Sequence, residues 1–221
     1  MRDHERYSRQ RDIVPAERIA ACKATVIGVG AIGRQVAMQL AAIGVPSLQL
    51  VDFDVVEVSN LASQGYLEED LGKLKVEATA ALCGRINSGI EILSVPERFR
   101  RSMEIGNTVF VCVDQIDVRR LIWEAVKDKV GFFCDARMSA EVLRVLTASD
   151  SRSRAHYPTT LFRAEEAFAG PCTAKTTIYC ANIAAGLMVA QFTKYLRRLP
   201  TELDLQLNLL ASELTIADAC L

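Results

Sequence analysis

The sequence has only two histidines, and none of its seven cysteines belongs to a C-x-x-C pair. Structural zinc sites are built from closely spaced cysteines and histidines, so the sequence argues against a zinc centre. The number of cysteines is odd, and the simplest interpretation is a set of reduced thiols in a cytoplasmic protein.

An excess of charge and a membrane-spanning run are also missing. The net charge is −1 over 221 residues, so no overall positive field favours nucleic acid or an anionic membrane. The N-terminal MRDHERYSRQRD has no apolar signal-peptide core. The most apolar run, IYCANIAAGLMVAQFTKYL, contains Asn182, Gln191 and Lys194, which is typical of a buried core helix. We expect no nucleic-acid partner and no membrane.

The apolar residues, 50% of the chain, suffice for one α/β domain over residues 1–221. Short apolar runs alternate with helical patterns, which predicts a Rossmann-like, mostly parallel sheet with helices on both faces. The expected strands cover 24–30, 47–54, 90–95, 107–114, 131–138 and 141–149, and the expected helices cover 31–44, 72–87, 116–130 and 174–198. A period-two pattern over 202–210 predicts a late antiparallel strand. The polar segment 150–171 is expected to be a crossover or lid loop.

Three glycines follow the first expected strand. In GVGAIG, Gly28, Gly30 and Gly33 form a G-x-G-x-x-G motif, which permits a tight turn and places an anion at a helix N-terminus. Asp52 ends the next strand, at the position of a ribose ligand. This pattern predicts a nucleotide site without choosing between NAD and ATP. The alternative is that the glycines only permit a tight strand–helix turn.

The residues beyond Asp52 resemble the ThiF/MoeB family of the ubiquitin-activating-enzyme-like superfamily. The residues that carry the resemblance are RYSRQ (6–10), Asp52, Asp54, Ser59-Asn60-Leu61, Gln64, Gly72, Lys75 and Asp114. The resemblance runs from about residue 6 to about residue 199. It implies adenylation, with ATP and Mg²⁺, of the C-terminal glycine carboxylate of a ubiquitin-like or sulfur-carrier protein.

The resemblance also implies roles for single residues. Asp52 holds the ribose, and Asn60 and Lys75 contact phosphate oxygens. Asp114 binds Mg²⁺. Arg9 is similar to the family arginine that reaches a neighbouring subunit's triphosphate, which implies a dimer, expected to be a homodimer. The other nucleotide-binding candidates are Gly28, Gly30, Gly33, Asp54 and Gln64.

Simpler interpretations stay open for four of these residues. Asn60 is then a turn residue, and Lys75 a solvated helix charge beside Lys73. Asp114 is then the N-cap of the helix expected at 116–130. Arg9 is then an ordinary surface arginine.

The chain departs from the family pattern at Ser63, where the family has an arginine. Serine does not replace the charge of a guanidinium. The candidates to replace it are Arg98, Arg100 and Arg101. Gln115 stands where an asparagine is expected. These departures leave room for a pseudo-enzyme or scaffold subunit that binds a ubiquitin-like protein or an active partner.

Two further enzyme classes remain as alternatives. An NAD-dependent oxidoreductase explains the glycines and Asp52 but leaves Asn60, Lys75 and Asp114 without roles. Adenylation of a small peptide or of a tRNA-linked carboxylate is the other, and the near-neutral charge argues against the tRNA version.

Cys172 begins a segment, CTAKTTIYCANIAAG, that resembles the catalytic-cysteine segment of autophagy-type activating enzymes. The resemblance implies a thioester on Cys172, or a part in sulfur transfer, and a separate, conjugating-enzyme-like acceptor. Pro171 and Thr173 suit a helix entry, where a thiol pKa is lowered, and Lys175 adds positive charge. The alternative is a small residue in a buried turn. The cysteines expected to be buried and inert are Cys22, Cys83, Cys112, Cys134 and Cys180, while Cys220 is expected to be exposed.

Overall fold

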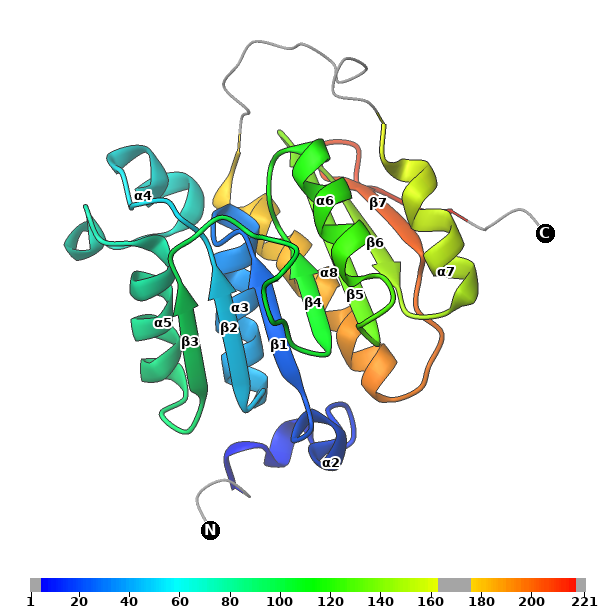
Figure 1. Ribbon diagram of the computed structural model, residues 1–221, viewed down its shortest axis with the longest axis horizontal. Coiled ribbons are helices and arrows are strands. Elements are labelled where there is room, and N and C mark those ends of the chain that lie inside the picture. The colour runs from blue at the N-terminus through cyan, green and yellow to red at the C-terminus, as the bar shows by residue number, and fades with distance from the viewer. Residues whose placement is uncertain (1–4, 163–175, 218–221) are drawn as a thin grey trace.

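The protein is a three-layer α/β domain in the computed structural model, which describes residues 5–162 and 176–217. A single sheet crosses it with strand order β3-β2-β1-β4-β5-β6-β7-β8 (Figure 1). The strands are β1 (Lys23–Ile27), β2 (Ser47–Val51), β3 (Glu91–Val95), β4 (Thr108–Val111), β5 (Phe132–Ser139), β6 (Val142–Ala148), β7 (Asp204–Asn208) and β8 (Glu213–Ile216). The pairs from β3 to β5 are parallel, and the pairs from β5 to β8 are antiparallel. The Rossmann-like prediction is confirmed.

Helices cover both faces of the sheet (Figure 1). The longer helices are α3 (Ala31–Ile43), α5 (Lys75–Ile86), α6 (Ile116–Val126) and α8 (Ile178–Leu196). The shorter ones are η1 (Ser8–Gln10), α2 (Ala16–Ile19), α4 (Val58–Gln64), η2 (Glu68–Asp70), α7 (Ser151–His156) and η3 (Tyr157–Thr160). Helices α3, α5 and α8 pack together on one face, while α6 lies on the other with η3.

Neighbouring residues of the central strands point to opposite faces, and both faces are buried. Phe132 belongs to the apolar cluster under α3 and α8, and Phe133 to the cluster under α6. Phe110 and Phe192 extend the first cluster, with ring centroids 5.6 Å apart. Each such side chain contributes about 1.5–3 kcal/mol on burial, which explains why these strands appear in the sequence as continuous apolar runs.

The expectation of a loop from residue 150 is wrong for the part that the structure describes. Asp150 caps α7 by accepting a hydrogen bond from the Ser153 amide at 2.8 Å. In η3, Tyr157 is buried between Trp123 and Phe133, with ring centroids 4.7 Å from each. The segment is polar because α7 has a solvated face.

Some boundaries and elements also differ from expectation. Helix α8 begins at Ile178 rather than near residue 174. The helix α4 and the edge strand β8 were not expected; every residue of β8 is exposed, so its sequence has no alternation of buried positions. Within residues 5–162 and 176–217, no helix has both the length and the apolar character needed to cross a membrane.

The topology places one end of the sheet in a special position. From β1 the chain moves outward through β2 to β3, and then returns to β4 on the other side of β1. Ligands of open α/β sheets bind beyond the carboxyl ends of the strands where the order reverses in this way. That point lies between β1 and β4, beside the three glycines.

Candidate nucleotide-binding site

The glycine loop between β1 and α3 depends on glycine for different reasons at different positions. Gly28 has φ +86°, and a Cβ there would lie 2.8 Å from the Cys112 carbonyl oxygen. A Cβ at Gly33 would lie 1.9 Å from the Gly28 carbonyl oxygen, so the helix packs directly on the loop. At Gly30 the nearest atom to such a Cβ is Gln64 Oε1, at 3.8 Å. The open side of the loop is therefore at Gly30, at the N-terminus of α3.

The middle of this loop is held from both sides. The Val29 amide donates to Asp52 Oδ2 at 2.6 Å, and the Val29 carbonyl accepts from the Tyr66 hydroxyl at 2.6 Å. Asp52 Oδ1 also accepts from the Asp54 amide at 2.9 Å. Each carboxylate oxygen has a second lone pair, so Asp52 can still accept a hydrogen bond from a ribose hydroxyl. Tyr66 was not identified from the sequence, because no pattern connects it to Val29.

Lys75 lies at the first position of α5 and is only 6% exposed. Its ammonium donates to Asp54 Oδ2 at 3.1 Å, and its amide donates to the Asp54 carbonyl. The interpretation of Lys75 as a solvated charge is therefore wrong. An ammonium has three donors, so the bond to the half-exposed Asp54 leaves Lys75 able to donate to a phosphate oxygen as well.

Asn60 has a structural partner on its own helix. Its Oδ1 accepts from the Glu57 amide at 3.0 Å and so caps α4. The cap agrees with the interpretation of Asn60 as a local structural residue, and its role toward phosphate stays a prediction. Gln64 Oε1 at the other end of α4 is buried without a hydrogen-bond partner. Its carboxamide adjoins Gly30 with Oε1 nearest, and a flip of the amide would direct the NH₂ group to a phosphate oxygen there.

Asp114 follows β4 and is exposed. The N-cap of α6 is Gln115, not Asp114, and no side chain caps that helix. The interpretation of Asp114 as an N-cap is therefore wrong. Among the described residues no cluster of three metal-ligating side chains exists. A magnesium ion that is bound mainly by substrate phosphates needs only one or two carboxylates, so Asp114 fits such an ion.

Ser63, which stands where the family has an arginine, is hydrogen-bonded to its own helix. Ser63 Oγ donates to the Ser59 carbonyl of its own helix at 2.9 Å. Of the three candidate replacements, Arg100 is paired with Glu97. The Arg98 guanidinium stacks over the Phe53 ring, 3.9 Å from its centroid, directly after β3 and next to Asp52. Arg98 is thus a cation at the edge where the nucleotide is expected.

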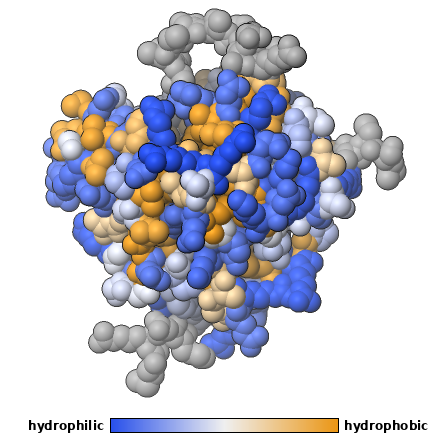
Figure 2. Space-filling model, viewed as in Figure 1, coloured by the Kyte–Doolittle hydropathy of each residue, from blue (hydrophilic) through white to orange (hydrophobic). Residues whose placement is uncertain are grey.

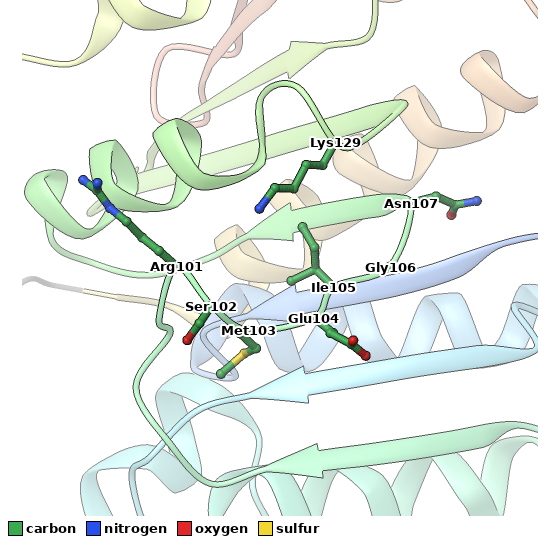
Figure 3. A pocket seen from close by; sticks show the side chains of 8 residues that line it. All are labelled: Arg101, Ser102, Met103, Glu104, Ile105, Gly106, Asn107 and Lys129. Carbon is green, nitrogen blue, oxygen red and sulfur yellow. The ribbon is translucent and has the colours of Figure 1, made fainter.

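Arg101 lines the cavity of about 500 Å³ shown in Figure 3. The cavity also contains Gly106, whose Cβ would lie 1.9 Å from the carbonyl oxygen of Lys23, the first residue of β1. Gly106 is therefore at the amino ends of the strands, whereas Figure 3 shows Arg101 at the other end of the lining, on the side toward which the strand arrowheads point. The lysine and arginine heads of the cavity do not converge on one point in Figure 3.

The N-terminal segment before β1 lies at the amino ends of the strands (Figure 1), and Arg9 belongs to η1 in that segment. Gln10, the last residue of η1, donates from its side chain to the carbonyl of Ile43 at the C-terminal end of α3. The glycine loop is at the other end of that helix, which spans about 20 Å at 1.5 Å per residue. The exposed Arg9 therefore does not reach the glycine loop of its own chain.

The cysteines within the described residues are free. Burial raises the pKa of Cys22 to about 11 and the pKa values of Cys83 and Cys134 to about 12. It also raises the pKa of Cys112 and of Cys180. The expectation of burial is confirmed for four of the five, and Cys112 is partly buried. Cys172, Lys175 and Cys220 lie outside the described residues.

The surface beside the site carries apolar side chains, at the α4 end of the molecule in Figure 2. The exposed ones from residues 53 to 71 are Phe53, Val55, Val58, Leu67 and Leu71. Val58 is 74% exposed. Such a group next to a binding site is typical of a surface that contacts another protein.

Known proteins share this sequence pattern and fold. Mouse "Adenylyltransferase and sulfurtransferase MOCS3" is 37% identical over 114 residues, which are 49% of this chain and 25% of that protein. The "SAMP-activating enzyme E1" of Haloferax volcanii is 36% identical over 104 residues, 44% of this chain and 38% of that protein. The matched regions therefore cover well under two thirds of these relatives' length.

Solved structures extend the similarity over most of the chain. The selenomethionine form of PaaA has a TM-score of 0.81 at 20% identity, covering 98% of this chain and 73% of that one. E. coli MccB with ATP has a TM-score of 0.73 at 17% identity, covering 91% and 65%. The model of the ThiF family matches residues 7–217, so this chain belongs to the ThiF family.

Proposed function

We propose that the protein activates the C-terminal glycine carboxylate of a ubiquitin-like or sulfur-carrier protein by adenylation. A carboxylate oxygen attacks the α-phosphorus of ATP, the bond between the α-phosphorus and the bridging oxygen breaks, and pyrophosphate leaves. The observation that carries this proposal is the convergence of the glycine loop, buried Lys75 and Asp114 at the switch point of the sheet. The names of the relatives, an adenylyltransferase and an activating enzyme, agree with it.

Each residue of the proposed site has its own role in adenylation. Gly30 and the N-terminus of α3 receive the phosphates, and Asp52 accepts a hydrogen bond from the ribose. Lys75 offsets the negative charge that develops as pyrophosphate leaves. Asp114 holds Mg²⁺, which neutralises phosphate charge when bound. Arg98 supplies the guanidinium that Ser63 lacks.

A second step is proposed at Cys172, whose thiolate attacks the acyl carbon to form a thioester and release AMP. A separate, conjugating-enzyme-like protein then accepts the acyl group. The support is the resemblance of the sequence around Cys172. The dipole of α8 contributes little to lowering the thiol pKa of Cys172, because α8 begins at Ile178 and the dipole effect fades within one turn.

A homodimer completes the proposed site. Arg9 lies about the length of α3 away from its own glycine loop, so it can serve only the site of a neighbouring subunit. The exposed apolar side chains around Val58 favour a protein as the carboxylate substrate. A small peptide remains the alternative substrate. One of the solved structures with this fold is described as E. coli MccB together with "SeMet MccA".

Ser63 supports a second candidate function, that of a pseudo-enzyme or scaffold subunit. Its hydroxyl is bonded to its own helix and carries no charge toward the phosphates. In that case the protein binds a ubiquitin-like protein or an active partner without forming an adenylate. The NAD-dependent alternative has no support from the relatives named above.

The test compares nucleotides and one variant. ATP with Mg²⁺ is expected to raise the melting temperature, because a ligand that binds only the native state stabilises it, and NAD is expected to do less. With a carrier protein ending in Gly-Gly, Asp114→Ala is expected to lose Mg²⁺-dependent ATP–pyrophosphate exchange and keep its fold. Stabilisation by NAD alone would contradict adenylation. ATP binding without exchange in the wild type would favour the scaffold.

A further inference from the structure

A buried carboxylate outside the proposed nucleotide contacts lies behind the turn that carries Asp114. Asp135 is in β5, opposite Val111 of β4, and its side chain is fully buried. A carboxylate in such a place is stable only if several donors surround it. Its position just before the carboxyl end of the parallel strands puts these donors close to the proposed metal ligand.

Each oxygen of Asp135 has partners. Oδ1 is paired with the guanidinium of Arg119, which is 5% exposed. Oδ2 accepts from Arg137 Nε at 3.0 Å and from the Tyr157 hydroxyl at 3.0 Å. Tyr157 is almost fully buried, so this group of four side chains is shielded from water and its bonds are strong.

Arg119 connects this group to the turn after β4. Its Nη2 donates to the Val113 carbonyl. That carbonyl belongs to the peptide unit that ends at the Cα of Asp114, and a peptide unit is planar. The bond therefore holds the N–Cα bond of Asp114, the axis about which its side chain is oriented. Burial lowers the pKa of Arg119 to about 10, so it remains a cation at neutral pH.

We propose that Asp135 is a positioning residue for Asp114: by balancing the charge of Arg119, it holds the Val113 carbonyl and thereby the carboxylate that receives Mg²⁺. The inference rests on the proposed function for its metal and on the contacts above for its geometry. Arg137 adds a second link, since it donates to the Thr160 carbonyl at 2.8 Å. The turn after β4 and the end of η3 are thus held by one carboxylate.

The chain offers a matched control at Asp204. It is 5% exposed and accepts two hydrogen bonds from Arg144, at 2.8 and 2.5 Å, and it contacts His156. Asp204→Asn weakens a buried ion pair in the antiparallel half of the sheet. None of the contacts of Asp204 within the described residues involves the turn after β4. Both variants are therefore expected to lose stability, and only Asp135→Asn is expected to change the Mg²⁺ dependence of nucleotide binding.

The first measurement titrates Mg²⁺ at a fixed concentration of a fluorescent ATP analogue, in the full-length protein. Asp135→Asn is expected to raise the half-saturating Mg²⁺ concentration on the order of tenfold, the usual loss when a residue supporting a metal ligand is changed. Asp204→Asn is expected to leave it unchanged. Equal Mg²⁺ dependence in the two variants overturns the proposal. Tyr157→Phe, which removes one bond to Asp135 and keeps the ring, is expected to shift it less in the same direction.

The second measurement needs no nucleotide and separates the two proposals. The amides of Cys112 and Arg119 flank the turn and donate to the carbonyls of Ile27 and Gln115. Their hydrogen exchange is expected to become faster in Asp135→Asn than in Asp204→Asn. If the wild type binds no ATP, the proposed function fails, while this exchange still tests the positioning. Unchanged exchange at both amides overturns it.

Discussion

Alanine substitution at Gly33 is expected to destabilise the fold. The new Cβ would meet the Gly28 carbonyl oxygen at 1.9 Å, and no side-chain rotation relieves a contact with backbone. Overpacking of this kind costs up to about 3 kcal/mol. Alanine recovers about 1 kcal/mol over glycine within a helix, so the net loss is about 3 − 1 = 2 kcal/mol. For a domain of this size, that lowers the melting temperature by about 4–8 °C.

Alanine substitution at Gly30, three residues earlier, is expected to cost less stability and to weaken nucleotide binding. Its Cβ would lie 3.8 Å from Gln64 Oε1, an ordinary contact. Gly30 is the N-cap of α3, where replacing glycine by alanine costs about 1 kcal/mol. In the proposed complex, however, the Cβ occupies space that the triphosphate needs. We expect the affinity for ATP to fall about tenfold or more, which corresponds to 1.4 kcal/mol or more.

Two assays on the same samples separate the effects. Thermal unfolding by circular dichroism measures stability, and calorimetric titration with ATP and Mg²⁺ measures affinity. Gly30→Ala with wild-type affinity for ATP would refute the placement of the phosphates at Gly30. Gly33→Ala with an unchanged melting temperature would refute the close packing of α3 on the loop.

The remaining predictions concern single side chains of the proposed site. Arg98→Ala is expected to weaken ATP binding about tenfold, while Arg100→Ala is not, since of these two it is Arg98 that stacks on the Phe53 ring, next to Asp52. Equal effects of the two substitutions would argue against Arg98 as the source of the charge that Ser63 lacks. Mixing Arg9→Ala chains with Asp114→Ala chains is expected to restore up to about one active site per mixed dimer, and a monomer in light scattering would contradict this. Cys172→Ala is expected to keep ATP–pyrophosphate exchange and to lose the thiol-sensitive adduct with the carrier. In the wild type, iodoacetamide is expected to alkylate Cys172 faster than the buried Cys83 and Cys134, because the raised pKa values of these two leave little thiolate.

Local spacing in the sequence was enough for the framework of the protein. The apolar runs are strands because both of their faces are buried, and the three glycines follow β1 because the turn and the packing of α3 demand them. Gly44, at φ +98°, ends α3 where the sequence predicted. Asp52 lies at the carboxyl end of β2, next to the glycine loop, because adjacent parallel strands end at the same edge of the sheet.

Contacts between residues far apart in the sequence became visible only in the tertiary structure. Asp135, Arg119 and Tyr157 come from β5, α6 and η3, and no spacing in the sequence connects them. The segment after Asp150 looks like a loop because α7 exposes polar side chains, and only the aromatic rings of α6 and β5 explain why Tyr157 is buried. In the same way the sequence offered three arginines in place of Ser63. The stacking of Arg98 on Phe53, the residue after Asp52, favours Arg98, and this contact depends on how the chain folds after β3.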